Sequence, residues 1–303
     1  MVFSERGCDI NSRIAENGVI IMLAASGSLA IFDGLTKYMV AFFSAGEIAL
    51  VRFGFGALVM LPVLLRQKAW FGKRDFSLLI LRGLLGVGVF YAVILAFQAG
   101  APISVTMVLF YTAPVWALLM GALLLGERLT WERTGGVMVA ILGITVLFNP
   151  LAQGISIGHL YGLLGGVMSA GNSVVTRYLR ARYDARLIYE FQCIVGSLAS
   201  IPLVIGDVRF PGARLGMVLL SAAIFGLLGQ VLMNHGYRFI RAAEGATLMM
   251  SEAIFAAMVG FFVFGEVITP QFVIGATLIL GSGVYLGLRA GTQKVDILRA
   301  NRI

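Results

Sequence analysis

The chain has 303 residues, of which 59% are hydrophobic and 13% are charged, and its mean hydropathy is +0.93. A soluble domain carries about 25% charged residues, so the composition excludes an ordinary soluble protein and predicts an integral membrane protein. The net charge of +8 would suggest a nucleic-acid partner in a soluble chain. In a membrane protein the same charge indicates basic cytoplasmic loops, so we expect no nucleic-acid partner.

Few residues of the chain suit catalysis or metal binding. Cys8 and Cys193 are the only cysteines, and they suggest neither a disulfide framework nor a metal cluster. His159 and His235 are the only histidines and lie in different regions of the sequence. The sequence has no phosphate-binding glycine loop and no Ser/His/Asp constellation. We therefore expect no cofactor, no metal and no enzyme activity.

In chain order, ten apolar segments of about 20 residues each predict ten transmembrane helices. They follow a polar N-terminal segment and are too long and too uniformly apolar for barrel strands of about ten residues. The first is expected to be an uncleaved helix and not a signal peptide. The segments cover residues 18–38, 46–65, 77–98, 103–124, 134–150, 158–177, 187–205, 215–236, 245–264 and 271–289.

The second half of the sequence repeats the pattern of the first. Lys37-Tyr38 aligns with Arg177-Tyr178 at an offset of 140, and Leu125-Gly126-Glu127 aligns with Phe264-Gly265-Glu266 at an offset of 139. Each half holds five segments, and an odd number of crossings forces the second copy to enter from the opposite side. The predicted fold is all-α, with two inverted five-helix repeats around a central cavity, an arrangement typical of transporters. The expected divisions are 1–17, a cytoplasmic segment; 18–150, the first repeat; 158–289, the second repeat; and 290–303, a cytoplasmic tail.

The basic residues indicate the orientation. Most of the 23 lysine and arginine residues fall on one side of the ten predicted helices, together with both termini. That side is expected to be cytoplasmic. These residues are Arg6, Arg13, Arg66, Lys68, Lys73, Arg74, Arg128, Arg133, Arg177, Arg180, Arg182, Arg186, Arg238, Arg241, Arg289, Lys294, Arg299 and Arg302.

Three sets of residues carry a family resemblance. They are Ala113-Pro114 with Leu125-Gly126-Glu127-Arg128-Leu129-Thr130, the partial repeat of this set in Glu252-Ala253 with Gly265-Glu266, and Val51-Arg52-Phe53. In order and duplicated, they resemble the EamA-type branch of the drug/metabolite transporter superfamily over residues 18 to 289. The resemblance implies a ten-helix permease that exports or takes up small organic metabolites.

The chain departs from many relatives at two places in the expected cavity. Ala253 stands where many relatives have proline, and Ile31-Phe32-Asp33 stands where many have tryptophan. Asp33-Gly34-Leu35-Thr36-Lys37, followed by Glu47 and Arg52, is more similar to members that take up S-adenosylmethionine than to amino-acid exporters.

Charged residues inside the spans are the main candidates for the site, because each costs at least about 2.5 kcal/mol to insert. Glu252 is the deepest and is expected either to bind a substrate ammonium or a proton, or to hold a neighbouring helix. Asp33, the second candidate for proton coupling, shares a helix face with Lys37. The two either neutralise each other or line the cavity with Arg52, which is too deep to lack an acidic partner. Arg82 is expected to anchor its helix at the membrane interface.

Uncharged polar residues on several helices suggest a wet cavity. Each serves either the substrate or helix packing. The full set of expected substrate and cavity residues is Asp33, Lys37, Arg52, Tyr91, Gln98, Tyr111, Trp116, Asn172, Gln192, Gln230, Asn234 and Glu252. A structural or gating role is expected for Pro114, which can kink its helix, and for Glu127 and Glu266 at the two membrane surfaces.

These features favour a secondary transporter of a small metabolite in a bacterial-type inner membrane, working by alternating access. Charges of both signs within the spans suggest a zwitterionic or cationic substrate, such as an amino acid, its derivative or an S-adenosylmethionine-like solute. Proton coupling, direction of transport and homo-oligomer formation stay open. The alternatives are a multidrug-type cation exporter and, from another class, an intramembrane enzyme. The enzyme would need a clustered nucleophile, base or metal site.

Overall fold

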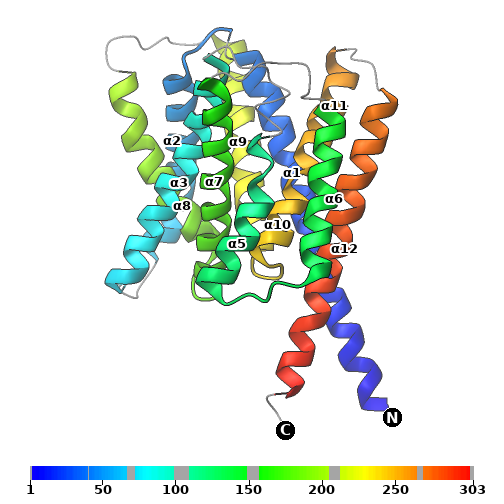
Figure 1. Ribbon diagram of the computed structural model, residues 1–303. Coiled ribbons are helices and arrows are strands. Elements are labelled where there is room, and N and C mark those ends of the chain that lie inside the picture. Colours follow the sequence, from blue (N-terminus) through cyan, green and yellow to red (C-terminus); the bar gives the residue numbers. More distant parts are fainter. Residues whose placement is uncertain are drawn as a thin grey trace.

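In the computed structural model the apolar segments form helices that lie side by side in a bundle (Figure 1). The structure describes residues 2–39, 41–66, 72–98, 109–148, 157–204, 212–264 and 269–300. The helices are α1 (Val2–Met39), α2 (Ala45–Leu65), α3 (Lys73–Gln98), α5 (Ala113–Leu125), α6 (Trp131–Phe148), α7 (Ile157–Leu179), α8 (Ala185–Ser200), α9 (Ala213–Gly236), α10 (Ala242–Met249), α11 (Ser251–Phe264) and α12 (Pro270–Ala300). A short 3-10 helix, Ile201–Leu203, continues α8.

The helices amount to ten spans, because α10 and α11 together form the ninth and α5 is the main part of the fourth. Four described stretches are long and apolar enough to cross a membrane by themselves: Asn17–Thr36, Ala45–Leu65, Lys73–Ala96 and Ala213–Gly236. Two shorter apolar stretches, Ala113–Leu125 and Pro270–Leu286, lie in the fourth and tenth spans. The all-α, ten-helix fold predicted from the sequence is confirmed.

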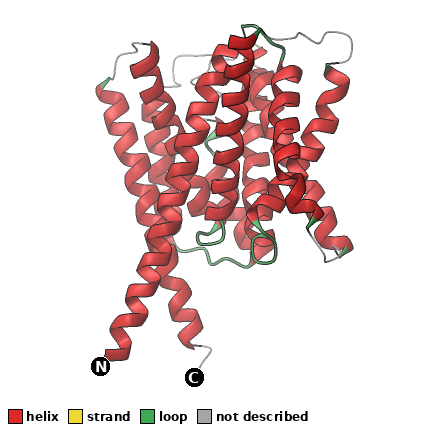
Figure 2. Ribbon diagram, turned by 180° about the vertical axis from the view of Figure 1, so that it is seen from behind, coloured by secondary structure: helices red, strands yellow, loops and turns green. Residues whose placement is uncertain are grey.

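Both termini lie at the same end of the bundle, where α1 and α12 extend beyond the other helices (Figures 1 and 2). The polar N-terminal segment is therefore a continuation of the first helix, which begins at Val2, and the last helix runs on to Ala300. We call this end the basic end, because the loops that carry Arg128, Arg182 and Arg238 also lie there.

The two repeats make matching contacts across an internal two-fold relationship. A Cβ atom on Gly56 of α2 would overlap Cys193 Sγ of α8, and one on Gly196 of α8 would overlap the ring of Phe53 of α2. Because 53 and 193, and 56 and 196, differ by 140, these are the same contact seen from each repeat. The close approach of α2 and α8 therefore requires glycine at both positions.

Local signals and larger contacts follow the same symmetry. Ser44 caps α2 and its counterpart at the offset of 140, Asp184, caps α8, each side chain accepting a backbone N–H of the first turn. In the first repeat α3 packs along α7 of the second, and correspondingly α9 of the second repeat packs along α1 of the first. Two further pairs, α2 with α8 and α6 with α12, join equivalent helices. The centre of the bundle thus lies between the two repeats.

Candidate functional site

The fourth and ninth spans, which correspond in the two repeats, are both broken. In the fourth, the helix is interrupted at Tyr111–Thr112 before α5 begins. In the ninth, α10 and α11 are separated at Met250, although no proline is present there. Broken helices at corresponding positions of two repeats are typical of transporter binding sites.

A side-chain hydroxyl marks each break in the same way. Thr112 Oγ1 donates to the Leu109 carbonyl at 2.6 Å, and Ser251 Oγ donates to the Leu248 carbonyl at 2.7 Å. Donor and acceptor in the second repeat are related to those in the first by the same offset of 139. Each hydroxyl therefore adds a bond to a carbonyl that also accepts a backbone N–H at the break, from Thr112 and Met250 respectively.

These two carbonyls also approach corresponding helices of the other repeat. Leu248 O accepts a second, longer contact of 3.4 Å from Ser26 Oγ on α1. Leu109 O lies against Gly166 on α7, at 2.9 Å from where a Cβ would stand. Because 26 and 166 differ by 140, the two breaks pack in equivalent ways. Irregular backbone at membrane depth is tolerated where it is buried in protein or lines a cavity, and both breaks meet that condition.

Two carboxyl groups meet beside the break in the ninth span. Asp33 on α1 and Glu252 in the first turn of α11 lie close enough for their carboxyl groups to interact. Two carboxylates this close would repel each other, so the arrangement favours one proton held between the two groups. The Tyr111 phenol, at the break in the fourth span, lies within electrostatic range of both groups.

Asp33 has protein on all sides and nevertheless exposes much of its surface, whereas Glu252 is half-buried. Both carboxyl groups therefore keep accessible surface beside the break in the ninth span.

Arg52 on α2 lies near this pair and is 7% exposed. Among the described residues its Nε has no hydrogen-bond partner and its guanidinium forms no ion pair. The Cζ atom lies 4.0 Å from the ring centroid of Phe32, with Phe90 and Phe53 at 5.4 and 5.5 Å. Three aromatic faces thus compensate the buried cation in part. Arg52 acts on Asp33 and Glu252 electrostatically. It forms an ion pair with neither, so the expected acidic partner is not found among the ion pairs of the described residues.

Other expected cavity residues lie in more local contacts. Tyr91 shares a 3.0 Å hydrogen bond with Ser200, and Trp116 Nε1 donates to Thr112 Oγ1 at 3.2 Å. Asn172 is buried, and its Oδ1 has no partner within the described ranges. Pro114 stands in the first turn of α5, directly after the break. The side chains of Lys37 and Gln98, and all of Glu266, lie outside the described residues.

Gln192, Gln230 and Asn234 surround a different arginine. Arg82 on α3 is 0% exposed, so the prediction that it anchors the helix at the membrane interface is wrong. Its Nη2 donates to Asn234 Oδ1 at 2.8 Å and to Gln230 Oε1 at 3.4 Å, and its Nη1 donates to Gln192 Oε1. Its Nε donates to Thr176 Oγ1 at 3.2 Å. Four neutral oxygens on α7, α8 and α9 therefore hold this guanidinium.

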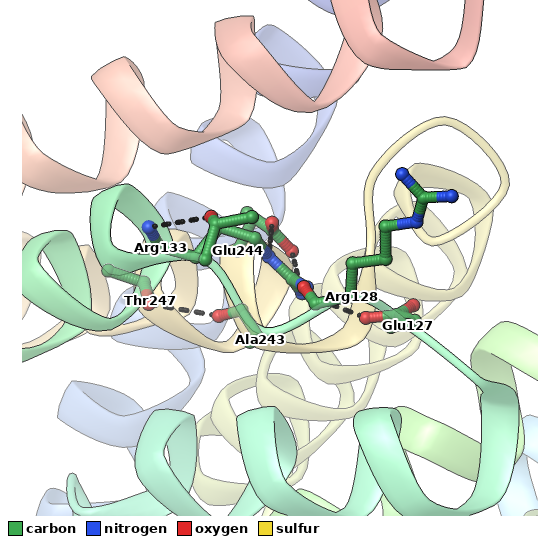
Figure 3. A network of polar contacts seen from close by, with 7 residues as sticks. Glu127, Arg128, Arg133, Ala243, Glu244 and Thr247 are labelled. Atoms are coloured by element: carbon green, nitrogen blue, oxygen red, sulfur yellow. Dashed lines mark hydrogen bonds and ion pairs between the residues drawn. The ribbon is translucent and has the colours of Figure 1, made fainter. Parts of the chain in front are cut away.

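A buried ion-pair cluster closes the basic end beside α10 (Figure 3). Arg133 Nε lies 2.7 Å from Glu244 Oε1, and Arg133 Nη2 lies 2.9 Å from Glu127 Oε2. Arg133 also donates to the Arg128 carbonyl, while the Arg128 side chain points away from the cluster. Gly126, at φ 66°, ends α5 in the left-handed conformation that turns Glu127 back towards α5. The cluster joins α5, α6 and α10.

The sequence reasoning missed three features of this arrangement. Arg133 was read only as a loop cation, and neither Glu244 nor Ser251 was singled out. A signal for Ser251 was present, because it aligns with Thr112 at the offset of 139. Glu244 offered a weaker signal, as an acid just before a span and just after Arg241.

Comparison with known proteins decides the family. The model of the EamA-like transporter family matches the chain twice, over residues 16–149 and 156–288. The chain belongs to the EamA-like transporter family. It is therefore a multi-pass membrane transporter and not an enzyme, as the sequence predicted.

Individual EamA relatives are distant but cover nearly the whole chain. The pseudopaline exporter CntI of Pseudomonas aeruginosa (strain UCBPP-PA14) is 28% identical over 273 residues, 88% of this chain and 94% of that protein. An S-adenosylmethionine uptake transporter of Rickettsia prowazekii is 23% identical, over 89% of this chain and 92% of that protein. A solved crystal structure has the same fold, with a TM-score of 0.72 and 19% identity, over 92% of this chain and 99% of that one.

Proposed function

We propose that this EamA-type protein is a secondary transporter of a small zwitterionic metabolite, an amino acid or a derivative such as S-adenosylmethionine, working by alternating access. The observation that carries the proposal is the nearness of Arg52, whose buried Nε has no hydrogen-bond partner among the described residues, to the carboxyl pair Asp33–Glu252. A substrate with a carboxylate and an ammonium group complements both.

Arg52 supplies the site for the substrate carboxylate. Burying a guanidinium without an anionic partner is costly, and Nε of Arg52 has no hydrogen-bond partner in the described part of the chain. A bound carboxylate would restore both the charge balance and the missing bonds, since a guanidinium binds carboxylates through two parallel N–H donors. S-adenosylmethionine and all free amino acids carry such a carboxylate.

The carboxyl pair supplies the site for the ammonium and for a proton. When Asp33 and Glu252 hydrogen-bond to each other they share one proton. An arriving ammonium favours two ionised carboxylates, so its binding releases that proton. Substrate cation and proton then compete for one site, which supports exchange of substrate for protons.

The proposed orientation places the basic end in the cytoplasm of a bacterial-type inner membrane, with both termini on that side. The Glu127–Arg133–Glu244 cluster then closes the cytoplasmic side, and the site opens outward in this state. In the Cys8→Ser, Cys193→Ala chain, an impermeant thiol reagent should label Gly212→Cys from outside the cell and Leu129→Cys from the cytoplasm only. Labelling of both from one side would refute the orientation.

Transport by the purified protein in proteoliposomes tests the function. The probes are radiolabelled S-adenosylmethionine, decarboxylated S-adenosylmethionine and the common amino acids, each with and without a pH gradient. We expect a carboxylate-bearing probe to accumulate under a pH gradient, and its decarboxylated analogue to be transported at least about tenfold less well. Transport of none of the carboxylate-bearing probes would overturn the proposal.

A multidrug-type cation exporter is the second candidate, because the carboxyl pair and the aromatic rings at Arg52 also suit an organic cation. Tetraphenylphosphonium, a cation without a carboxylate, separates the two functions in the same vesicles. Its transport in preference to every carboxylate-bearing probe would favour the exporter.

A further inference from the structure

Two of the buried arginines, Arg52 and Arg82, occupy related surroundings in the two repeats. Gly86 of α3 packs against Gln192, and Gly226 of α9 packs against Arg52. Because 86 and 226, and 52 and 192, differ by 140, Arg52 stands in one repeat where Gln192 stands in the other.

Arg82 also has no arginine as its counterpart in the second repeat. Its counterpart at the offset of 140 is Ala222, which is 3% exposed and has no polar side chain. Each half of the bundle thus holds one guanidinium at an equivalent place. Near the basic end it comes from α3 (Arg82) beside Gln192, and in the other half it comes from α2 (Arg52) beside Gly226.

The two guanidinium groups differ in how they are satisfied. Arg82 is closed off by four oxygen acceptors, among them Thr176 Oγ1. The counterpart of Thr176 is Thr36, whose buried Oγ1 has no partner among the described residues. Nε of Arg52 has none among them either. The Arg82 guanidinium is therefore held by acceptors, whereas Nε of Arg52 and Oγ1 of Thr36 have no partner among the described residues.

From this geometry we infer that Arg82 is a second site for the substrate carboxylate, used when the bundle opens at the basic end. In alternating access two inverted repeats exchange conformations, so the surroundings of Arg52 and Arg82 exchange as well. The cage of Thr176, Gln192, Gln230 and Asn234 opens in the other state, and Arg82 then faces the solvent with unsatisfied donors. The substrate carboxylate is held by Arg52 from one side and by Arg82 from the other.

The neutral character of the cage suits such a role. A carboxylate in permanent contact with Arg82 would compete with the substrate, whereas amide and hydroxyl oxygens form weaker bonds than a charged acceptor. The ligand class is an anion with the planar geometry of a carboxylate. This inference rests on the proposed function for the identity of the substrate but not for the opening of the cage.

The first experiment needs no substrate. In a chain with Cys8→Ser and Cys193→Ala, the reporter Thr176→Cys replaces one cage residue, which is 0% exposed. A membrane-impermeant maleimide is added from the basic end, with and without Glu244→Gln, which breaks the ion-pair cluster. We expect labelling of the reporter to rise at least about tenfold with Glu244→Gln, because the cage then opens to that side. A reporter that stays unlabelled from the basic end in both chains overturns the inference.

The second experiment measures half-saturating concentrations from each side, with S-adenosylmethionine or the amino acid that the wild type transports. Arg82→Lys keeps the charge and supports folding, and Arg52→Lys is its matched partner. We expect Arg82→Lys to raise the half-saturating concentration at least about fivefold from the basic end and little from the other, and Arg52→Lys to do the reverse. Equal effects from both sides would overturn the two-site inference. A wild type that transports no probe rejects the proposed function, and the reporter experiment still decides whether the cage opens.

Discussion

Thr112 and Ser251 make the same hydrogen bond at the same place in two inverted repeats. Each hydroxyl is donated to the carbonyl three residues earlier, at 2.6 and 2.7 Å, where its span is broken. The breaks divide the fourth and ninth spans into two parts each. The hydroxyl bond holds each break in one geometry.

Ser251→Ala should therefore slow transport more than it destabilises the fold. The lost hydrogen bond is worth about 1 kcal/mol, which is small against the stability of the bundle. Ser77→Ala is the matched control, since Ser77 Oγ donates to the Lys73 carbonyl at 2.9 Å on an exposed surface. Transport rate and thermal unfolding are measured for both variants. An equal effect of the two substitutions on transport would argue against a special role for the break.

Glu244→Gln should open the basic end. Arg133 and Glu244 are 5% and 2% exposed at their side chains, and removing one partner of such a pair costs about 3–5 kcal/mol. Only the closed state contains the pair, so that state should lose population. Accessibility of the bundle interior to an impermeant thiol reagent from the basic end measures the shift.

Glu132→Gln is the matched control for this cluster. Glu132 forms an ion pair with Arg289, and the two side chains are 35% and 60% exposed. Exposed pairs of this kind contribute about 0–1 kcal/mol to stability. We expect no change in accessibility for Glu132→Gln. The exchange of charges in Arg133→Glu with Glu244→Arg should restore part of the closed state.

Arg52→Ala should abolish transport, and Arg52→Lys should restore it poorly. Lysine keeps the charge but lacks the planar pair of donors that a carboxylate needs. Arg214→Ala, at an exposed position near the start of α9, should transport normally. Uptake by proteoliposomes that contain equal amounts of folded protein is the measurement. Near-normal uptake by both Arg52 variants would remove Arg52 from the substrate site.

Glu252→Gln distinguishes a role of Glu252 in proton coupling from a role in substrate binding. A glutamine cannot release a proton, so accumulation driven by a pH gradient should be lost while exchange between two loaded compartments persists. Loss of substrate binding as well would identify Glu252 as the ammonium partner. Equilibrium binding, pH-driven uptake and exchange are compared in the same preparation. A variant normal in all three would leave Glu252 a packing residue.

Gly56→Ala and Gly196→Ala should destabilise the bundle by similar amounts. Each added methyl group would overlap a side chain of the facing helix, and overpacking of this kind costs about 1–3 kcal/mol. Gly54→Ala, with nothing within 4 Å of its added methyl group, is the control and should be neutral or slightly stabilising. Thermal unfolding in detergent measures all three. A large difference between Gly56→Ala and Gly196→Ala would contradict the internal symmetry.

The fold was largely predictable, because span length and repeat offset are local properties of the sequence. The offset of 140 that aligns Lys37 with Arg177 also relates Gly56 to Gly196 and the cap Ser44 to Asp184. The site was predictable only in part. Depth and charge singled out Arg52 and Glu252, but no sequence rule places Asp33 against Glu252, since their contact depends on how α1 and α11 pack.

Arg82 shows why the rest could not be predicted. From the sequence, a cation near the cytoplasmic end of its predicted helix resembles a side chain that reaches the membrane surface. The cage that holds it comes from three helices of the other repeat, so its burial depends on long-range packing. The ion pair of Arg133 with Glu244 was hidden for the same reason.

Among the described residues, the cluster at the basic end has no equivalent at the other face. Thr130 Oγ1 accepts the Arg133 N–H at 3.3 Å, and its counterpart at the offset of 139, Thr269 Oγ1, accepts the Phe272 N–H at the same distance. The backbone is repeated, but phenylalanine replaces the arginine. A carrier whose two ends are closed by interactions of unequal strength populates its two states unequally when no substrate is bound. The direction of net transport still follows the gradients. The substrate concentration that gives half-maximal transport should nevertheless differ between the two sides of the membrane.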